Sequence, residues 1–269
     1  MNQNHAGERA GGDADREVFA DGNMSDVVRH GDIVERRMGS WSAASHAVLS
    51  HLDAVGFEGA PRLLAIEGER ELLTFIDGAS APADLTGFSS DDLVAAVAAL
   101  IRDLHDALTS FTPAPDLVFP RMPGAPEGAG FICHNDLAPW NTIFKHGRPE
   151  AFIDWDLVAP APPEWDLAYA AWRFVPLYPD DALYGDAASR GRRLRTFLDA
   201  YGMADEQRSG FVPLIRQRQV SAYETVEQWG GAGMPGFARL FEQRLHVGAL
   251  DDIAWLDANG ATLREVIIS

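Results

Sequence analysis

Short apolar runs bounded by turn residues mark the first third of the chain. Residues 27–36 have the pattern of two strands around a glycine turn, and residues 61–66 and 71–75 that of a second hairpin. Between the hairpins, residues 43–55 carry apolar side chains at helical spacing and stop before a glycine. This pattern predicts a small β-rich region that contains one helix.

After residue 90 the hydrophobic period becomes that of helices. Ser90 can cap a helix that runs to Leu108, because leucine, valine and isoleucine recur along one of its faces. The change of pattern falls at residues 77–82, a stretch rich in small residues and turn formers. Further helices are expected at residues 164–174, 190–201 and 211–229, and within residues 235–268.

These two patterns predict an α+β chain made of a tail and two lobes. Residues 1–21 are polar and rich in Gly, Ala and Asp, so we expect a flexible tail and no signal peptide. Residues 22–78 are expected to form a small lobe ending in a hinge, and residues 79–269 a larger helical lobe. The 269 residues, 46% of them hydrophobic, are enough to bury a sizeable core.

Composition narrows the expected partners and compartment. A net charge of −18 opposes nucleic-acid binding, because a phosphate backbone would be repelled. The charge is compatible with a cationic small substrate, although solubility alone also explains an acidic surface. The longest apolar run, residues 93–101, is too short to span a bilayer. One cysteine, Cys133, excludes internal disulfides and fits a reducing compartment, so we expect a cytoplasmic protein that binds no membrane.

One short segment carries the clearest chemistry. His134, Asp136 and Asn141 form an H-x-D-x-x-x-x-N element, and Asp154 follows at the end of an apolar strand. Kinases build phosphoryl transfer from such parts: a base for the attacking hydroxyl and oxygen ligands for Mg²⁺. In this interpretation Asp136 is the base, and Asn141 and Asp154 hold the metal against the nucleotide phosphates.

The neighbouring residues strengthen that interpretation. Residues 131–133, 141–144 and 151–153 are apolar and are expected to be strands, with a turn at residues 145–150. A strand leading into the motif, followed by a hairpin, would bring Asp136, Asn141 and Asp154 around one point.

These motifs resemble those of the aminoglycoside phosphotransferase and choline kinase-like family of small-molecule kinases. The matching pieces are residues 133–141, 152–156 and 165–168, and the order of elements fits from about residue 23 to the end. The resemblance implies a protein-kinase-like bilobal fold with a nucleotide between the lobes. It also implies transfer of the γ-phosphate of ATP, with GTP as the alternative, to a hydroxyl of a small acceptor in the presence of Mg²⁺.

The resemblance also implies roles for individual residues. Asp136 is expected to be the catalytic base, and His134 to fix the catalytic loop. Asn141 and Asp154 are expected to bind Mg²⁺. Asp166 is expected to be a structural acid that pairs with the backbone of the catalytic loop or with an arginine.

Nucleotide contacts are expected from the small lobe. Residues 73–76 resemble the hinge, so the backbone of Thr74, Phe75 and Ile76 would bind the edge of the purine. A reduced glycine-rich loop around Ser25 would touch phosphate through backbone amides, although a plain turn is an equal alternative.

Two residues expected of this family are missing. The third strand of the small lobe has no lysine, since the only lysine of the chain is Lys145. Either an arginine replaces it or the nucleotide is held differently. Between Arg36 and Arg37, period-2 alternation favours Arg36, which would place Val34 on the same nucleotide-facing side. The helical glutamate that would pair with that lysine is also absent, and Ser45 and His46 occupy its region.

Several points stay open at this level. Asp156 stands where kinases often have glycine, and it would either add a metal ligand or end the strand. The missing lysine and glutamate leave a pseudokinase, a binding or regulatory module, as the alternative to an active enzyme. A metal-dependent hydrolase that uses Asp154 and Asp156 is a third interpretation, but it lacks a histidine cluster.

The acceptor site is expected on the helical lobe. Trp229 and the glycine-rich stretch after it are candidates for a mobile wall of the site, with an ordinary loop as the alternative. An arginine cluster at residues 190–195 is expected to be a solvated helix face. The acidic candidates for binding a cationic acceptor are Glu164, Glu224, Glu227, Asp251 and Asp252.

Overall fold

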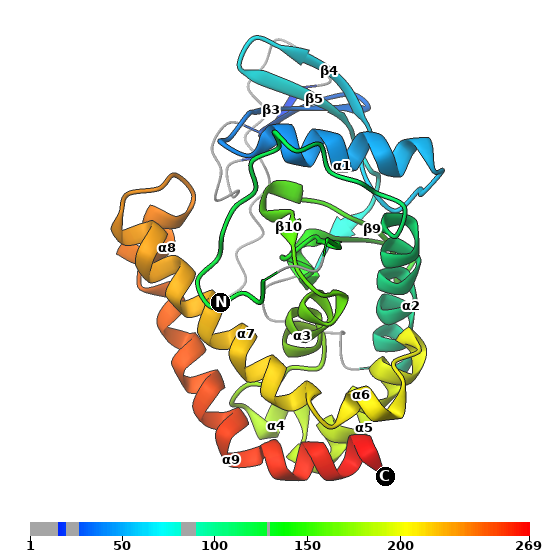
Figure 1. Cartoon of the computed structure of the whole chain (residues 1–269), viewed down its shortest axis with the longest axis vertical. Coiled ribbons are helices and arrows are strands. Elements are labelled where there is room, and N and C mark those ends of the chain that lie inside the picture. Colours follow the sequence, from blue (N-terminus) through cyan, green and yellow to red (C-terminus); the bar gives the residue numbers. More distant parts are fainter. Residues whose placement is uncertain (1–15, 20–26, 82–89, 128–129) are drawn as a thin grey trace.

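A five-stranded antiparallel sheet forms the small lobe at the top of Figure 1, with helix α1 lying across it. The computed structural model describes residues 16–19, 27–81, 90–127 and 130–269. The strand order is β1-β2-β3-β5-β4, so β3 pairs with a strand that lies beyond α1 in the chain. The elements are β1 (Arg16–Phe19), β2 (Val27–His30), β3 (Ile33–Arg37), α1 (Ser42–Ala54), β4 (Leu63–Glu67) and β5 (Arg70–Thr74).

Strand β1 corrects the predicted tail. Residues Arg16–Phe19 pair with β2 in antiparallel register, so the segment expected to be a flexible tail contains an edge strand. The pairing was not visible in the sequence because four residues carry too little periodicity to separate a strand from a polar loop. The rest of the predicted tail lies outside the described residues.

The larger lobe is built from helices, of which the longer ones, α2, α3, α5, α7 and α9, bury apolar side chains. Ser90 caps α2, since its side chain accepts a hydrogen bond from the Leu93 N–H, and α2 ends at Leu108 as predicted. Helix α5 packs between α2 and α9, and α7 packs between α3 and α9. The helices are α2 (Asp91–Leu108), α3 (Pro163–Phe174), α4 (Asp181–Tyr184), α5 (Ala187–Tyr201), α6 (Asp205–Arg208), α7 (Phe211–Thr225), α8 (Phe237–Glu242) and α9 (Gly248–Ile268).

Two small sheets connect the lobes and carry the motif. Strand β6 (Ala79–Ser80) pairs with β8 (Thr142–Lys145), which forms a hairpin with β9 (Arg148–Phe152). Strand β7 (Ile132–Cys133), which leads into the motif, pairs instead with β10 (Ala159–Pro160). The predicted strand at 141–144 begins one residue late, because Pro139–Asn141 form a 3₁₀ helix, η1.

The arginine cluster on α5 corrects another expectation. Arg190 is fully buried, and its guanidinium donates to the carbonyls of Pro176, Tyr178 and Gly185 and pairs with Asp181. Its carbonyl partners come from the chain before α5, so helix periodicity alone could not reveal them.

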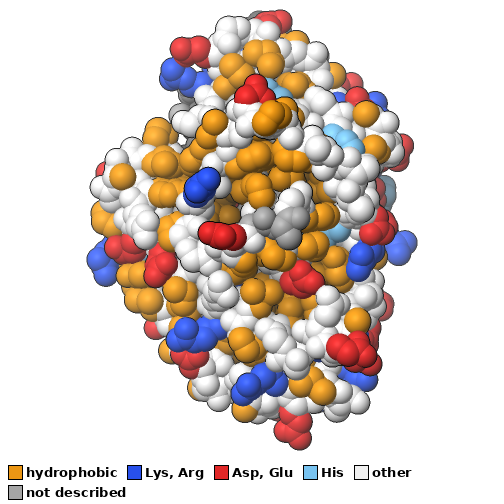
Figure 2. Space-filling model, viewed as in Figure 1, with side chains coloured by type: hydrophobic (Ala, Val, Ile, Leu, Met, Phe, Trp, Pro, Cys, Tyr) orange, Lys and Arg blue, Asp and Glu red, His pale blue; other side chains and the backbone are white. Residues whose placement is uncertain are grey.

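One continuous hydrophobic core joins the two lobes: it includes Leu49 of α1 in the small lobe and Leu104 of α2 in the large lobe. On the face shown in Figure 2, hydrophobic side chains gather in the middle, and charged side chains lie mainly toward the rim. Among the described residues, no helix combines the length and apolarity needed to cross a bilayer. The predicted α+β organisation, with a small β-rich part and a larger helical part, is confirmed.

Candidate active site

The catalytic loop begins where β7 ends, and a buried carboxylate holds its start. Asp166, in the first turn of α3, accepts hydrogen bonds from the backbone N–H groups of His134 (2.8 Å) and Asn135 (2.6 Å). Burial alone would raise the pKa of Asp166, but the hydrogen bond from His105 and these N–H groups lower it. Asp166 therefore stays ionised, and its predicted pairing with the loop backbone is confirmed.

Two residues that the sequence analysis did not single out also hold this loop. Asn135 adopts a left-handed backbone conformation (φ 68°), and its side-chain amide donates to the carbonyls of Leu157 (2.9 Å) and Ala159 (3.3 Å). Arg218, from α7, donates to the Asn135 carbonyl at 2.6 Å. The position of Asn135 inside the motif was a usable signal, whereas nothing near Arg218 in the sequence points to the loop.

His134 links the loop to the segment that carries Asp154. Its Nδ1 accepts a hydrogen bond from the Asp136 N–H (3.2 Å), which leaves Nε2 to donate to the Ile153 carbonyl (3.1 Å). Burial lowers the pKa of His134, so the ring is neutral and can hold this arrangement of one donor and one acceptor. The geometry makes His134 a positioning residue for the loop.

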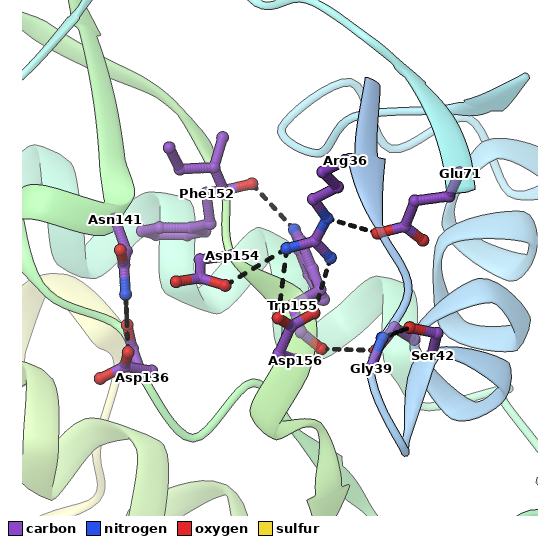
Figure 3. A network of polar contacts seen from close by, with 12 residues as sticks. Arg36, Gly39, Ser42, Glu71, Asp136, Asn141, Phe152, Asp154, Trp155 and Asp156 are labelled. Carbon is purple, nitrogen blue, oxygen red and sulfur yellow. Dashed lines mark hydrogen bonds and ion pairs between the residues drawn. The ribbon is translucent and has the colours of Figure 1, made fainter. Parts of the chain in front are cut away.

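Asp136 and Asn141 face each other across the loop. The Asn141 side-chain nitrogen donates to the Asp136 carboxylate (2.7 Å) and to the Asp136 carbonyl (3.1 Å). Figure 3 shows this pair on one side of Asp154 and Arg36 on the other. With its nitrogen engaged, Asn141 keeps its side-chain oxygen as the group that can bind a metal.

Asp154 occupies a strained backbone position with a crowded charge environment. It has φ 64° and ψ 66°, a conformation that a non-glycine residue adopts only when its surroundings enforce it. The side chain is 44% exposed. Restricted solvation around the carboxyl group and repulsion from Asp156 raise the pKa of Asp154 to about 7, despite the nearby Arg36. A cation at this point would restore the ionised form.

Arg36 lies at the junction of the lobes, as strand alternation predicted, and Arg37 points outward. The Arg36 side chain is 12% exposed, whereas that of Arg37 is 62% exposed and pairs with Glu69. Arg36 donates to both oxygens of Asp156, at 2.6 and 3.2 Å. Burial would lower the pKa of Arg36, but the charges of Asp156, Glu71 and Asp154 raise it, so this cation is permanent.

Glu71 is the buried partner that the sequence analysis missed. It stands opposite Arg36 in the β3–β5 register, is fully buried, and accepts hydrogen bonds from Arg36 Nε and His46 Nε2. These bonds lower the pKa of Glu71 although burial acts to raise it. A glutamate that alternates with Leu73 on the buried face of β5 was the available signal.

The α1 residues found in place of a helical glutamate each have a defined partner. The Ser45 hydroxyl donates to the carbonyl of Trp155, at 2.8 Å, and His46 binds Glu71. Trp155 belongs to the 3₁₀ helix η2 (Trp155–Leu157), which follows Asp154 directly. Helix α1 therefore contacts the site through the turn after Asp154.

The donor set fits a hard divalent cation. The side-chain oxygens of Asn141 and Asp154 are of the kind that Mg²⁺ binds. Both carboxylate oxygens of Asp156 already accept hydrogen bonds from Arg36, so Asp156 is not counted as a ligand. No cluster of three or more His, Cys, Asp or Glu suited to a metal occurs in the described part of the chain. Asn141 and Asp154 would thus need water and phosphate oxygens to complete the coordination shell.

The residues expected at the hinge are largely engaged within the small lobe. The Phe75 N–H donates to the Asp32 carbonyl (2.8 Å), and the Thr74 N–H donates to the Arg62 carbonyl (2.9 Å). No described residue accepts a hydrogen bond from the Ile76 N–H. Val34 is partly buried against the core. Ser25 and the reduced glycine loop lie outside the described residues.

A pocket of about 290 Å³ lies beside the catalytic loop in the helical lobe. Trp140, which precedes Asn141, lines it together with Arg173 from α3 and Asp252 from α9. Burial raises the pKa of Asp252 to about 6. The remaining lining residues are Tyr178, Tyr184, Leu245, His246, Gly248 and Ala249.

The other acceptor candidates lie elsewhere or are already paired. Glu227 accepts a hydrogen bond from His246 (2.6 Å), and Glu164 accepts one from Gln207 (3.0 Å). Trp229 lies in a π-helical turn that continues α7, and its ring contacts those of Trp41 and Phe237. The predicted mobile wall at Trp229 is therefore a packed helix end.

Comparisons with known proteins place the chain among phosphotransferases. Residues 115–208 match the phosphotransferase enzyme family. The trifolitoxin immunity protein of Rhizobium leguminosarum bv. trifolii is 35% identical over 202 residues, which cover 71% of this chain and 76% of that protein.

Solved structures share the fold at low sequence identity. A choline/ethanolamine kinase family protein from Mesorhizobium loti has a TM-score of 0.61 and 15% identity, covering 94% of this chain and 92% of that one. Choline kinase from Cryptosporidium parvum also has a TM-score of 0.61, with 13% identity and coverage of 91% and 90%. The GDP complex of an aminoglycoside 2'-phosphotransferase mutant has a TM-score of 0.56 and 14% identity, covering 93% of this chain and 92% of that one. The predicted kinase-like fold is thereby confirmed.

Proposed function

Because this chain belongs to the phosphotransferase enzyme family and is a small-molecule kinase, we propose the reaction that it catalyses. It transfers the γ-phosphate of ATP, as its Mg²⁺ complex, to a hydroxyl group of a small acceptor, so that the bond between the γ-phosphorus and the β–γ bridging oxygen breaks and ADP leaves. The observation that carries this proposal is that Asp136 and Asn141 are hydrogen-bonded to each other and that Asp154, which follows β9, lies near enough for the charge of Asp136 to act on it (Figure 3).

Asp136 acts as the base in the proposed mechanism. Its carboxylate orients the acceptor hydroxyl and takes the proton as the oxygen attacks the γ-phosphorus. The Asn141 amide fixes the carboxylate by donating to it at 2.7 Å. Asp166 and His134 keep the loop in place through the contacts to its backbone.

Asn141 and Asp154 are the proposed metal ligands. The bound ion would neutralise charge on the β- and γ-phosphates. The raised pKa of Asp154 supports this role, because a carboxylate crowded by Asp136 and Asp156 is stabilised by a nearby cation.

The nucleotide base is proposed to lie on the small-lobe side of the junction. Val34 would pack on the base, and the segment Thr74, Phe75 and Ile76 would border its edge. The Ile76 N–H is the donor that supports a hydrogen bond to the base, since the other two amides are engaged. Either ATP or GTP meets this description.

The acceptor is proposed to bind in the pocket beside Trp140. The aromatic walls suit a hydroxylated molecule with an apolar body, and Asp252 is the carboxylate that would bind an amine beside the Arg173 guanidinium. The likeness to a toxin immunity protein supports a protective role, in which phosphorylation of a toxic compound inactivates it.

Calorimetric titration with ATP and with GTP, each with and without Mg²⁺, tests the proposal. We expect Mg²⁺ to strengthen nucleotide binding, and Asp154→Ala to remove that gain while leaving metal-free binding unchanged. An equal loss of both would reject Asp154 as a metal ligand. Binding without any turnover of hydroxylated amines or sugars would favour the pseudokinase alternative, which the missing lysine supports.

A further inference from the structure

We propose that Arg36 is a positioning residue that ties the turn carrying Asp154 to the small lobe through Asp156, and that it does not contact a nucleotide phosphate directly. The inference rests on the proposed function in one respect, the assignment of Asp154 as a metal ligand. It replaces the phosphate-binding role that a family lysine would have with a role in holding the metal aspartate.

The hydrogen-bond donors of Arg36 are already distributed among carboxylates. A guanidinium has five N–H groups. The Nε–H goes to Glu71, and the two terminal nitrogens each donate to one oxygen of Asp156. One terminal nitrogen also lies 3.5 Å from an Asp154 oxygen. Glu71 and Asp156 thus bind three of the five N–H groups and compensate the positive charge of Arg36 before a phosphate can reach it.

The same turn is held at three further points. Ser45 donates to the Trp155 carbonyl, and the Phe152 N–H donates to the Gly59 carbonyl at 2.9 Å. His134 donates to the Ile153 carbonyl. These bonds fix the backbone on both sides of Asp154, and Figure 3 shows Arg36 supplying the side-chain link across the junction. The left-handed conformation of Asp154 requires such support.

Two departures from the family pattern then have one explanation. Arginine stands where the family has lysine, and Asp156 stands where kinases often have glycine. An arginine can bind both oxygens of a carboxylate through its planar fork, while a lysine ammonium cannot reproduce that geometry. The arginine and the aspartate are thus two halves of one contact.

The experiment compares Arg36→Lys, Asp156→Asn and the double variant by calorimetry with ATP, with and without Mg²⁺. Arg37→Lys is the matched control, because Arg37 lies on the same strand but is exposed. We expect each single variant to lose about tenfold in Mg²⁺–ATP affinity, as for residues that orient a metal ligand. Metal-free ATP binding should stay at the parent level, and the double variant should lose no more than either single variant.

The opposite result would come from a direct phosphate contact. Asp156→Asn would then release Arg36 and strengthen ATP binding with or without metal, and Arg36→Lys would bind like the parent. Either observation overturns the inference.

Melting temperatures without ligand provide a second readout. A contact between the two side chains predicts that the double variant melts no lower than the worse single variant, whereas additive losses would refute the contact. If the parent binds no Mg²⁺–ATP, the proposed function fails together with the effect on Asp154. The melting data would still decide whether Arg36 holds the turn.

Discussion

The catalytic loop and the charged junction between the lobes are each held in place in a different way. The junction consists of Arg36, Glu71 and Asp156. The loop is fixed within the large lobe, where Asp166 accepts two backbone N–H groups and Arg218 donates to a backbone carbonyl. The junction is fixed between lobes by side-chain ion pairs, in which Arg36 binds Glu71 and Asp156. Backbone contacts set the position of the loop, whereas the junction adds a balance of side-chain charges to the backbone contacts made by Ser45, Gly59 and His134.

This difference suits the two regions to different proposed roles, proton transfer in the loop and metal binding at the junction. The proposed proton acceptor, Asp136, needs a fixed direction toward its substrate, and backbone hydrogen bonds to its loop supply that rigidity. In the proposed mechanism Asp154 is a metal ligand, which works with a charge that arrives with the nucleotide. Its neighbours can therefore compensate one another in the free protein and adjust when the ion binds.

The largest effect is expected from Asp136→Asn. Loss of the base should lower kcat by about 10²–10⁴-fold, while nucleotide affinity stays close to the parent value. Steady-state kinetics and calorimetry measure the two quantities, and Asp103→Asn, at an exposed site on α2, is the control. If Asp136→Asn turned over like the parent, the assignment of Asp136 as the base would be wrong. The proposed role of the junction would then stand without a role for the loop.

The next effect is expected from Glu71→Gln at the junction. It removes the charge that Arg36 and His46 share, but Asp156 still compensates the arginine. We therefore expect the free energy of unfolding to fall by about 3 kcal/mol, the lower part of the range for breaking a buried ion pair. Denaturant unfolding measures it, with the exposed Glu69→Gln as control. Equal values for both variants would mean that the junction is not held by its charges.

A smaller loss of stability is expected from Asp166→Asn in the loop. The amide can still accept one backbone N–H, so we expect about 1–3 kcal/mol, the cost of leaving one buried donor unsatisfied. Because the loop carries Asp136, kcat should fall as well, while the gain in nucleotide affinity from Mg²⁺ should persist. Loss of that gain would show that loop and junction act as one unit.

Prediction from sequence succeeded where the partners are close along the chain. The caps, hairpins and helix registers follow from local spacing, as Ser90 and the β8–β9 turn illustrate. The motif also predicted that Asp136, Asn141 and Asp154 would lie near one another, because its spacing ties one loop to one hairpin. Prediction failed for Arg190, whose partners lie in the segment just before α5 and outside its helical repeat, and for Arg218, whose partner lies 83 residues away.

The sequence by itself determined the two-part α+β organisation, the phosphotransferase motif and the inward direction of Arg36. Those properties depend on periodicity and on short spacings, which a single chain displays directly. Only the tertiary structure decided that Glu71 and Asp156 share Arg36, because β3 pairs with β5 across an intervening helix. Glu71 and Asp156 lie 35 and 120 residues from Arg36 in the sequence, and only the fold brings their carboxylates into contact with it. No local sequence pattern predicts these contacts.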